Sequence, residues 1–329
     1  MRKALMISTA IWAASALAAG GVNVSIHEWE LPTPKSRPHD PAVGADGALW
    51  YTAQEANAIG RLDPTTGTIK QFALTTPHSG PHGLVSDSAG NIWFTANYAG
   101  YIGKLDPKSG KVTEFKINDP RGHDPHTPVI APDGRVWFTV QNGNTVGVLD
   151  PRTDAIKLAD VPTAHALPYG LVLDSKGTLY FCEFGSNKIA SIDPATMHIH
   201  EFVLPASEAR PRRLRLANDT TIYYSDFQRG YLGRLDLGSG TVKEWPSPGG
   251  PKSHPYGIAI TPDGIVWYSE SGVTPNTLVR FDPQTDGFQK WNIPSGGGVV
   301  RNMVATSDGR LYLACSGVNR VAIANIVAP

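Results

Sequence analysis

Seven polar residues recur along this 329-residue chain at intervals of 43 to 45 residues, and all of them can form hydrogen bonds. They are His39, His82, His126, Tyr169, Arg212, Tyr256 and Arg301. The three histidines could accept protons or bind zinc or copper. We expect the five residues His39, Tyr169, Arg212, Tyr256 and Arg301 to contact a substrate.

A second series has the same spacing and lies 14 residues after the first. It reads Ala53, Ala96, Val140, Glu183, Asp226, Glu270 and Cys315. The carboxylates of Glu183, Asp226 and Glu270 could supply the oxygen ligands that magnesium or calcium prefers. Duplication alone also places residues in register, and a carboxylate beside Arg212 can be a satisfied ion pair. The site is therefore expected to have a histidine side and an acidic side.

The elements that must position these residues form a repeated cassette, which is clearest from Gly80 to Ile117. Each copy holds four short runs of β-branched and aromatic residues, separated by turn signals such as Asp46-Gly47. Seven copies with a period near 43 residues predict an all-β, seven-bladed propeller. The first strand of a blade begins where the second ends, so both series are expected at one mouth of the central channel.

The two ends of the chain predict how the ring closes. The last copy stops after its third strand, near residues 321–326, and residues 25–31 resemble the fourth strand of the other copies. The N-terminal segment should complete the last blade and remove an exposed sheet edge. We expect one domain over residues 22–329, with blades near residues 37–74, 80–117, 124–160, 167–204, 210–247, 254–293 and 299–326.

Composition restricts the partners and the compartment. The formal net charge is zero, so no basic excess favours nucleic acid or an anionic membrane surface. Residues 1–18 have the pattern of a secretory signal with cleavage after Ala18, and no other stretch could span a bilayer. We expect a periplasmic or secreted monomer. Cys182 and Cys315 fall in distant blades, so both are expected to be free, buried thiols.

The cassette from Pro81-His82-Gly83 to Val112-Thr-Glu-Phe115 resembles the virginiamycin B (streptogramin B) lyase family over the whole mature chain. The resemblance implies a seven-bladed propeller that opens a cyclic depsipeptide by elimination. It also implies that a histidine removes a proton beside the ester while magnesium polarises the ester carbonyl.

This sequence departs from that family in the last two blades, where the resemblance places the lyase site. The family's histidines and acids are replaced by Tyr256, Val299, Arg301 and Cys315. A rotated register is a second interpretation, with His126 as the base, His82 beside the substrate and Asp124 holding the metal. The fourth position is then Val140, which is no metal ligand.

Three functions stay open on this evidence. The first is a lyase assisted by magnesium or another divalent cation. The second is a hydrolase like the gluconolactonase-type propellers, with a metal among Glu183, Asp226 and Glu270 and with Asn97 or Asn302 nearby. The third is a binding or scaffold propeller without catalysis. In each case the expected partner is a small molecule at the channel mouth.

Overall fold

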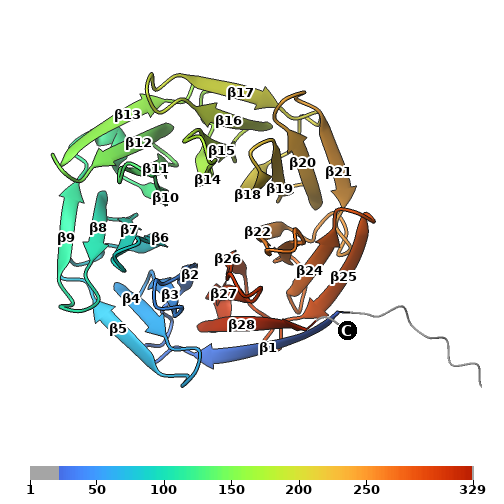
Figure 1. The fold of residues 1–329 in the computed structure, drawn as a ribbon, viewed down its shortest axis with the longest axis horizontal. Helices are drawn as coiled ribbons and strands as arrows, with labels where there is room; N and C mark the ends of the chain where they lie inside the picture. The colour runs from blue at the N-terminus through green and yellow to red at the C-terminus, as the bar shows by residue number, and fades with distance from the viewer. Residues whose placement is uncertain (1–21, 328–329) are drawn as a thin grey trace, which may run out of the picture.

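Seven four-stranded antiparallel sheets surround a central channel in the computed structural model, which describes residues 22–327 (Figure 1). In each sheet the first strand lies at the channel and the fourth at the rim. The predicted seven-bladed β-propeller is confirmed. No helix within residues 22–327 is long and apolar enough to cross a membrane.

The strand bounds repeat from blade to blade. Blades one to three comprise β2 (Pro38–Val43), β3 (Leu49–Ala53), β4 (Ala58–Leu62) and β5 (Ile69–Ala73); β6 (Pro81–Ser86), β7 (Ile92–Ala96), β8 (Tyr101–Leu105) and β9 (Val112–Lys116); and β10 (Pro125–Ile130), β11 (Val136–Val140), β12 (Thr145–Asp150) and β13 (Ala155–Asp160). Blades four to six comprise β14 (Pro168–Leu173), β15 (Leu179–Glu183), β16 (Lys188–Ile192) and β17 (Ile199–Val203); β18 (Pro211–Asn218), β19 (Thr221–Asp226), β20 (Tyr231–Asp236) and β21 (Val242–Pro246); and β22 (Pro255–Ile260), β23 (Val266–Glu270), β24 (Thr277–Asp282) and β25 (Gly287–Asn292). Short 3₁₀ turns occur at Pro120–Gly122 and Ser316–Val318.

The seventh blade is built from both ends of the chain. It consists of β26 (Val300–Ala305), β27 (Leu311–Cys315), β28 (Arg320–Val327) and β1 (Asn23–Glu30). β1 pairs antiparallel with β28, from Asn23 opposite Val327 to Glu30 opposite Arg320 (Figure 1). The closing strand is therefore confirmed, and it protects the edge of β28. The predicted signal, residues 1–18, lies outside the described residues.

The hydrophobic core lies between adjacent blades and uses the aromatic residues of the second strands. Trp50, Trp137 and Trp267 are almost completely buried there. Cys182 and Cys315 are free and buried in the core, as predicted. The ring is thus held together by packing and not by covalent links.

Every first strand carries an irregularity where it leaves the channel mouth. In the first blade Pro38 lies opposite Ala53 and Pro41 opposite Tyr51, so three steps on β2 match two on β3. The same bulge occurs in the other six blades. A bulge re-aims the side chains that follow it. This local feature shapes the site described next.

Candidate functional site

The seven residues of the first series form a ring at the channel mouth, which we call the mouth ring. A cavity of about 190 Å³ opens there, and every member of the mouth ring except Tyr256 lines it. The rings of His39, His82, His126 and Tyr169 lie one after another, with successive centroids 3.6, 3.9 and 3.8 Å apart. The histidines of three separate blades therefore form one cluster.

The bulge brings a second ring of residues to the channel, directly beneath the first. In a regular strand, neighbouring side chains point to opposite faces. Here both His39 and the next residue, Asp40, face inward and bond to each other, with Nδ1 2.9 Å from Oδ1. The equivalent residues in all blades, which we call the inner ring, are Asp40, Gly83, Thr127, Gly170, Arg213, Gly257 and Asn302.

The inner ring closes the channel with a buried ion pair. Arg213, with no exposed surface, reaches across from blade five, and its Nη2 lies 2.7 Å from Asp40 Oδ1 in blade one. Its Nη1 donates to Thr127 Oγ1 at 3.2 Å. Asn302 Nδ2 donates to the other oxygen of Asp40 at 3.0 Å. Asp40 is thus fully engaged, and this network joins blades one, three, five and seven across the channel.

The three histidines are held as neutral side chains. Burial lowers the pKa of His39 well below its usual value, and the charges of Arg301 and Arg213 lower it further. Burial and His39 do the same to the pKa of His82, and burial and His82 to that of His126. Neutral imidazoles can accept a proton, and the bond to Asp40 leaves Nε2 of His39 as the accepting nitrogen if Nδ1 carries the hydrogen.

The other half of the cavity wall is phenolic and cationic. The hydroxyl groups of Tyr169 and Tyr256 share a short hydrogen bond, and Arg212 Nη2 lies 3.4 Å from the Tyr169 hydroxyl. Burial alone raises the pKa of Tyr169, but Arg212 and Arg213 outweigh it and hold that pKa below its usual value. The wall can therefore donate hydrogen bonds to a ligand and stabilise negative charge on it.

Hydroxyl groups on the second strands fix the mouth ring in space. Thr95 Oγ1 accepts from the Gly83 backbone N–H at 2.9 Å and donates to the His126 carbonyl of the next blade at 2.7 Å. The same bond to a backbone carbonyl of the following blade is made by Thr52, Thr139, Ser225 and Ser269. Blades four and seven carry Cys182 and Ala314 instead. These bonds tie His82, His126, Tyr169 and Tyr256 of the mouth ring, and Val300 next to Arg301, to the preceding blade.

The three carboxylates expected to share a metal do not meet, which corrects the predicted acidic side. Glu183 bonds to Ser186, Asp226 pairs with Arg229, and Glu270 accepts from Thr277. Glu183 and Asp226 bond within their own blades, and Glu270 also accepts from Ser247 in the segment that follows blade five, so each carboxylate has separate partners. No aspartate or glutamate in residues 22–327 lines the cavity.

Asp124 is also separated from the histidine that it was expected to assist. Its carboxylate accepts hydrogen bonds from the backbone and side-chain amides of Asn142, at 2.8 and 2.7 Å. It therefore shapes the loop between β11 and β12. His126 bonds through Nδ1 to Thr127 Oγ1 at 2.9 Å. It lies beside His82, which is the arrangement that the interpretation with a rotated register requires.

The donor set at the mouth does not fit the magnesium that the resemblance implies. Magnesium prefers oxygen ligands, particularly carboxylates. Within residues 22–327, the only group of three potential ligands close together is His39, Asp40 and His82. Oδ1 of Asp40, which bonds to His39, is already paired with Arg213. Arg301 adds a second positive charge beside His39. A cation would have to displace a buried ion pair in a positive environment.

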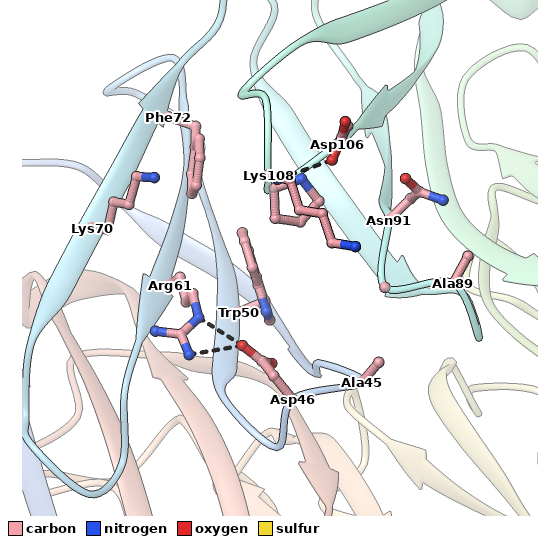
Figure 2. Close-up of a pocket in the computed structure, with 12 residues that line it drawn as sticks. Ala45, Asp46, Trp50, Arg61, Lys70, Phe72, Ala89, Asn91, Asp106 and Lys108 are labelled. Carbon is pink, nitrogen blue, oxygen red and sulfur yellow. Dashed lines mark hydrogen bonds and ion pairs between the residues drawn. The ribbon is translucent and has the colours of Figure 1, made fainter.

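A larger hollow lies between blades one and two, near the turns at the opposite end of the strands from the mouth (Figure 2). Its volume is about 710 Å³, and its floor includes the stacked rings of Trp50 and Phe72. Its Asp46 is paired with Arg61 at 2.7 Å. A counterpart of about 340 Å³ between blades six and seven is lined by Asp263, Trp267 and Arg280. This hollow is a product of the repeat, so the mouth is the better candidate site.

Fold and mouth together define a seven-bladed propeller with a polar pocket at one end of a plugged channel. The model of the virginiamycin B lyase family matches residues 8–270, and the chain belongs to this family. The matched part ends before blade seven, where Val299, Arg301 and Cys315 replace the residues that the resemblance expects.

Solved structures agree with this assignment. A streptogramin B lyase structure is 28% identical, with a TM-score of 0.84 over 93% of this chain and 98% of its own. A catalytically inactive histidine-to-alanine variant of virginiamycin B lyase from Staphylococcus aureus, with quinupristin, is 23% identical, with a TM-score of 0.83 over 93% of this chain and 100% of its own. Hydrazine synthase of Kuenenia stuttgartiensis shares the fold alone, at 16% identity and a TM-score of 0.74 over 91% of this chain and 97% of its own.

Sequence reasoning missed the inner ring. Its members follow the mouth ring directly, and a regular strand would have pointed them away from the channel. One signal was available, because this series consists only of polar residues and glycines. Gly83 shows why small residues belong there, since a Cβ atom would lie 2.4 Å from the His126 carbonyl oxygen.

Proposed function

We propose that this chain is an exported propeller of the virginiamycin B lyase family that opens a carbon–oxygen bond by elimination, with His39 as the proton acceptor. The observation that supports this role is the hydrogen bond between His39 Nδ1 and Asp40, which orients a neutral imidazole at the cavity wall. A carboxylate that orients a histidine is a recurring arrangement in general-base sites.

In the proposed step, Nε2 of His39 takes the proton from a carbon next to a carbonyl group. The electrons of that C–H bond form a carbon–carbon double bond as the adjacent carbon–oxygen bond breaks. The released oxygen leaves as a carboxylate or takes up a proton, and no water is consumed. Arg301 and Arg212 would stabilise the negative charge on the carbonyl oxygen, so the step needs no metal.

The test measures products by mass spectrometry after incubation in H₂¹⁸O. Since the Staphylococcus aureus relative was solved with quinupristin, this cyclic compound is the first substrate to test, followed by simpler cyclic esters. Elimination gives an opened product without ¹⁸O, whereas hydrolysis of the gluconolactonase type incorporates one ¹⁸O atom. Incorporation of ¹⁸O would overturn the proposal.

The residue assignment is tested with three matched variants. We expect His39→Gln to lower turnover by about 10²–10⁴-fold, the usual contribution of general-base catalysis. His198→Gln removes an exposed histidine far along the chain and should leave turnover unchanged. If His126→Gln abolishes turnover while His39→Gln retains it, the base is His126 and the present assignment is wrong.

A binding protein without catalysis is the second candidate. The observation that favours it is the replacement of the expected lyase residues by Tyr256, Val299, Arg301 and Cys315. It predicts ligand binding at the mouth with no opened product under any condition.

Export is proposed from residues 1–18 alone. Expression of the full chain in a Gram-negative host, followed by cell fractionation and intact mass measurement, should give a periplasmic or secreted protein that begins at Ala19. A full-length chain in the cytoplasm would refute export.

A further inference from the structure

Two arginines at the mouth have no acidic partner. Arg212 and Arg301 both line the cavity, and neither forms an ion pair with a carboxylate in residues 22–327. The Nε atoms of both are buried without a hydrogen-bond partner. Most other arginines around the ring are paired, as Arg213 is with Asp40. A partly buried guanidinium group without a counter-charge is costly unless a ligand supplies one.

Arg212 is held rigidly by aromatic rings instead of by an acid. Its guanidinium carbon lies 3.8 Å from the ring centroid of Tyr256, 4.4 Å from that of Phe227 and 4.5 Å from that of Phe184. Cation–π contacts fix the plane of the group without satisfying its N–H donors. A fixed guanidinium plane with unused donors is suited to a carboxylate, which accepts two parallel hydrogen bonds.

The positive charge continues into an adjoining hollow of about 370 Å³, between blades seven and one. Arg301 and Arg37 line both spaces, and Lys35 adds a third cation. The single acid there is Glu55, which is paired with Arg37 at 3.1 Å. The two spaces share Arg37 and Arg301 in their walls, so they adjoin each other and together carry a surplus of positive charge.

The backbone at Arg37 adopts a left-handed conformation that recurs at this position of the repeat. Arg37 has a φ of +51°, a left-handed conformation that disfavours residues with a Cβ atom. The equivalent residue of the next blade is Gly80, at a φ of +57°. Leu167 and His254, at the same position of blades four and six, have φ values of +50° and +47°, so the repeat sets this conformation and Arg37 is the residue that brings a cation to it.

Polar atoms without partners mark the same cavity. His82 is 5% exposed and its Nδ1 has no hydrogen-bond partner, and Oε1 of the buried Gln54 has none either. Both residues line the cavity. Such orphaned groups indicate that a ligand or ordered water completes the site.

We infer that the mouth binds a small carboxylic acid, with a carboxylate held between Arg212 and Arg301 and without a divalent metal. A second acidic group of the same molecule would extend toward Arg37 and Lys35. This inference rests on the proposed function only for the location of the site, and it specifies the class of substrate. The arginines supply the positive charge that a metal supplies in the mechanism implied by the resemblance.

The test is isothermal titration calorimetry at pH 7 and low salt, with EDTA present. The probes are succinate, glutarate and adipate, the uncharged diamides of the same lengths, and inorganic phosphate. We expect the diacids to bind and the diamides not to bind. Equal binding of acids and amides, binding of phosphate alone, or binding only after magnesium is added would overturn the inference.

Four variants localise the binding. Arg212→Gln and Arg301→Gln should each weaken diacid binding by about ten- to a hundredfold, the usual range for a lost charged hydrogen bond. Arg310→Gln, which changes an arginine already paired with Asp308, is the control and should bind normally. If Arg212→Gln fails to fold, Arg301→Lys keeps the charge but loses the planar fork and should still bind more weakly. Unchanged affinity in both Arg301 variants would refute the assignment.

The outcome is separable from that of the proposed function. His39→Gln should retain diacid binding, because the carboxylate is held by the arginines. Diacid binding without elimination would disprove the lyase proposal alone. Elimination of neutral esters, together with equal binding of the diacids and the diamides, would disprove the carboxylate inference alone.

Discussion

Acid should destabilise this propeller through the histidines at its mouth, and the slope of that effect can be worked out from the structure. Burial lowers the pKa of His39, His82 and His126 well below the value of an unfolded histidine, about 6.5. Below pH 6.5 the unfolded chain therefore binds three protons that the folded chain does not. Stability is fully present above pH 6.5 and falls as the pH drops.

Glu183 acts in the opposite direction. Burial raises its pKa to about 7, so the folded chain keeps a proton that the unfolded chain has lost above pH 4.5. Between pH 4.5 and 6.5 the unfolded chain binds three more protons on the histidines and one fewer on Glu183 than the folded chain does. The unfolded chain therefore binds two more protons in total. Each proton corresponds to about 1.4 kcal/mol per pH unit, so the free energy of unfolding should fall by about 2.7 kcal/mol for each unit below pH 6.5.

The assay is urea unfolding followed by tryptophan fluorescence at half-unit steps from pH 5 to 7, with the slope m required to stay constant. His126→Asn should reduce the dependence to about 1.4 kcal/mol per pH unit, and Glu183→Gln should increase it to about 4 kcal/mol. His198→Asn, an exposed control, should leave it unchanged. A stability that is level between pH 6.5 and 5, or the same slope in His126→Asn, would refute the reasoning.

Three further outcomes are expected, each measured by urea unfolding. Arg37→Gly should raise the free energy of unfolding by up to about 1 kcal/mol by relieving the left-handed backbone, while diacid binding weakens; a clear loss of stability would contradict this. Thr95→Val should lower it by about 2 kcal/mol, because the buried carbonyl of His126 loses its donor, and no change would mean that the hydroxyl bond is dispensable. Arg213→Met should lower the free energy of unfolding by about 3–5 kcal/mol, because it leaves the charge of Asp40 buried alone. Asp40→Asn in the same chain should restore most of this free energy. A double variant as unstable as the single one would contradict the ion-pair explanation.

The architecture was predictable because the same turn and strand signals recur in the seven repeats. Turn pairs such as Asp46-Gly47 and aromatic residues such as Trp50 recur with one period, so an error in one copy is corrected by the others. The closing strand was predictable for the same reason, since residues 25–31 match the fourth strands of complete blades. Seven copies of one local signal amount to a global prediction.

The direction of side chains at the mouth was less predictable than their position. Glu183 lies at the mouth end of its strand, as expected, but its carboxylate turns to Ser186 within the same blade. The bulge in the first strand is what turns both His39 and Asp40 inward. No residue type in the sequence predicts this bulge, because the bulge depends on how β2 pairs with β3.

The contact between Asp40 and Arg213 shows why the site itself escapes a repeat-based analysis. These residues are 173 positions apart and belong to different blades, and each is the one member of its charge type in the inner ring. Averaging over the repeats therefore removes the residues that differ, and the proposed chemistry depends on those residues. Because all seven first strands present equivalent backbone positions to the channel, a base or a cation can move to another blade without a change of fold. The replacement of the expected lyase residues in blade seven, beside an oriented histidine in the adjacent blade one, is consistent with such a move and is what the His39 variants test.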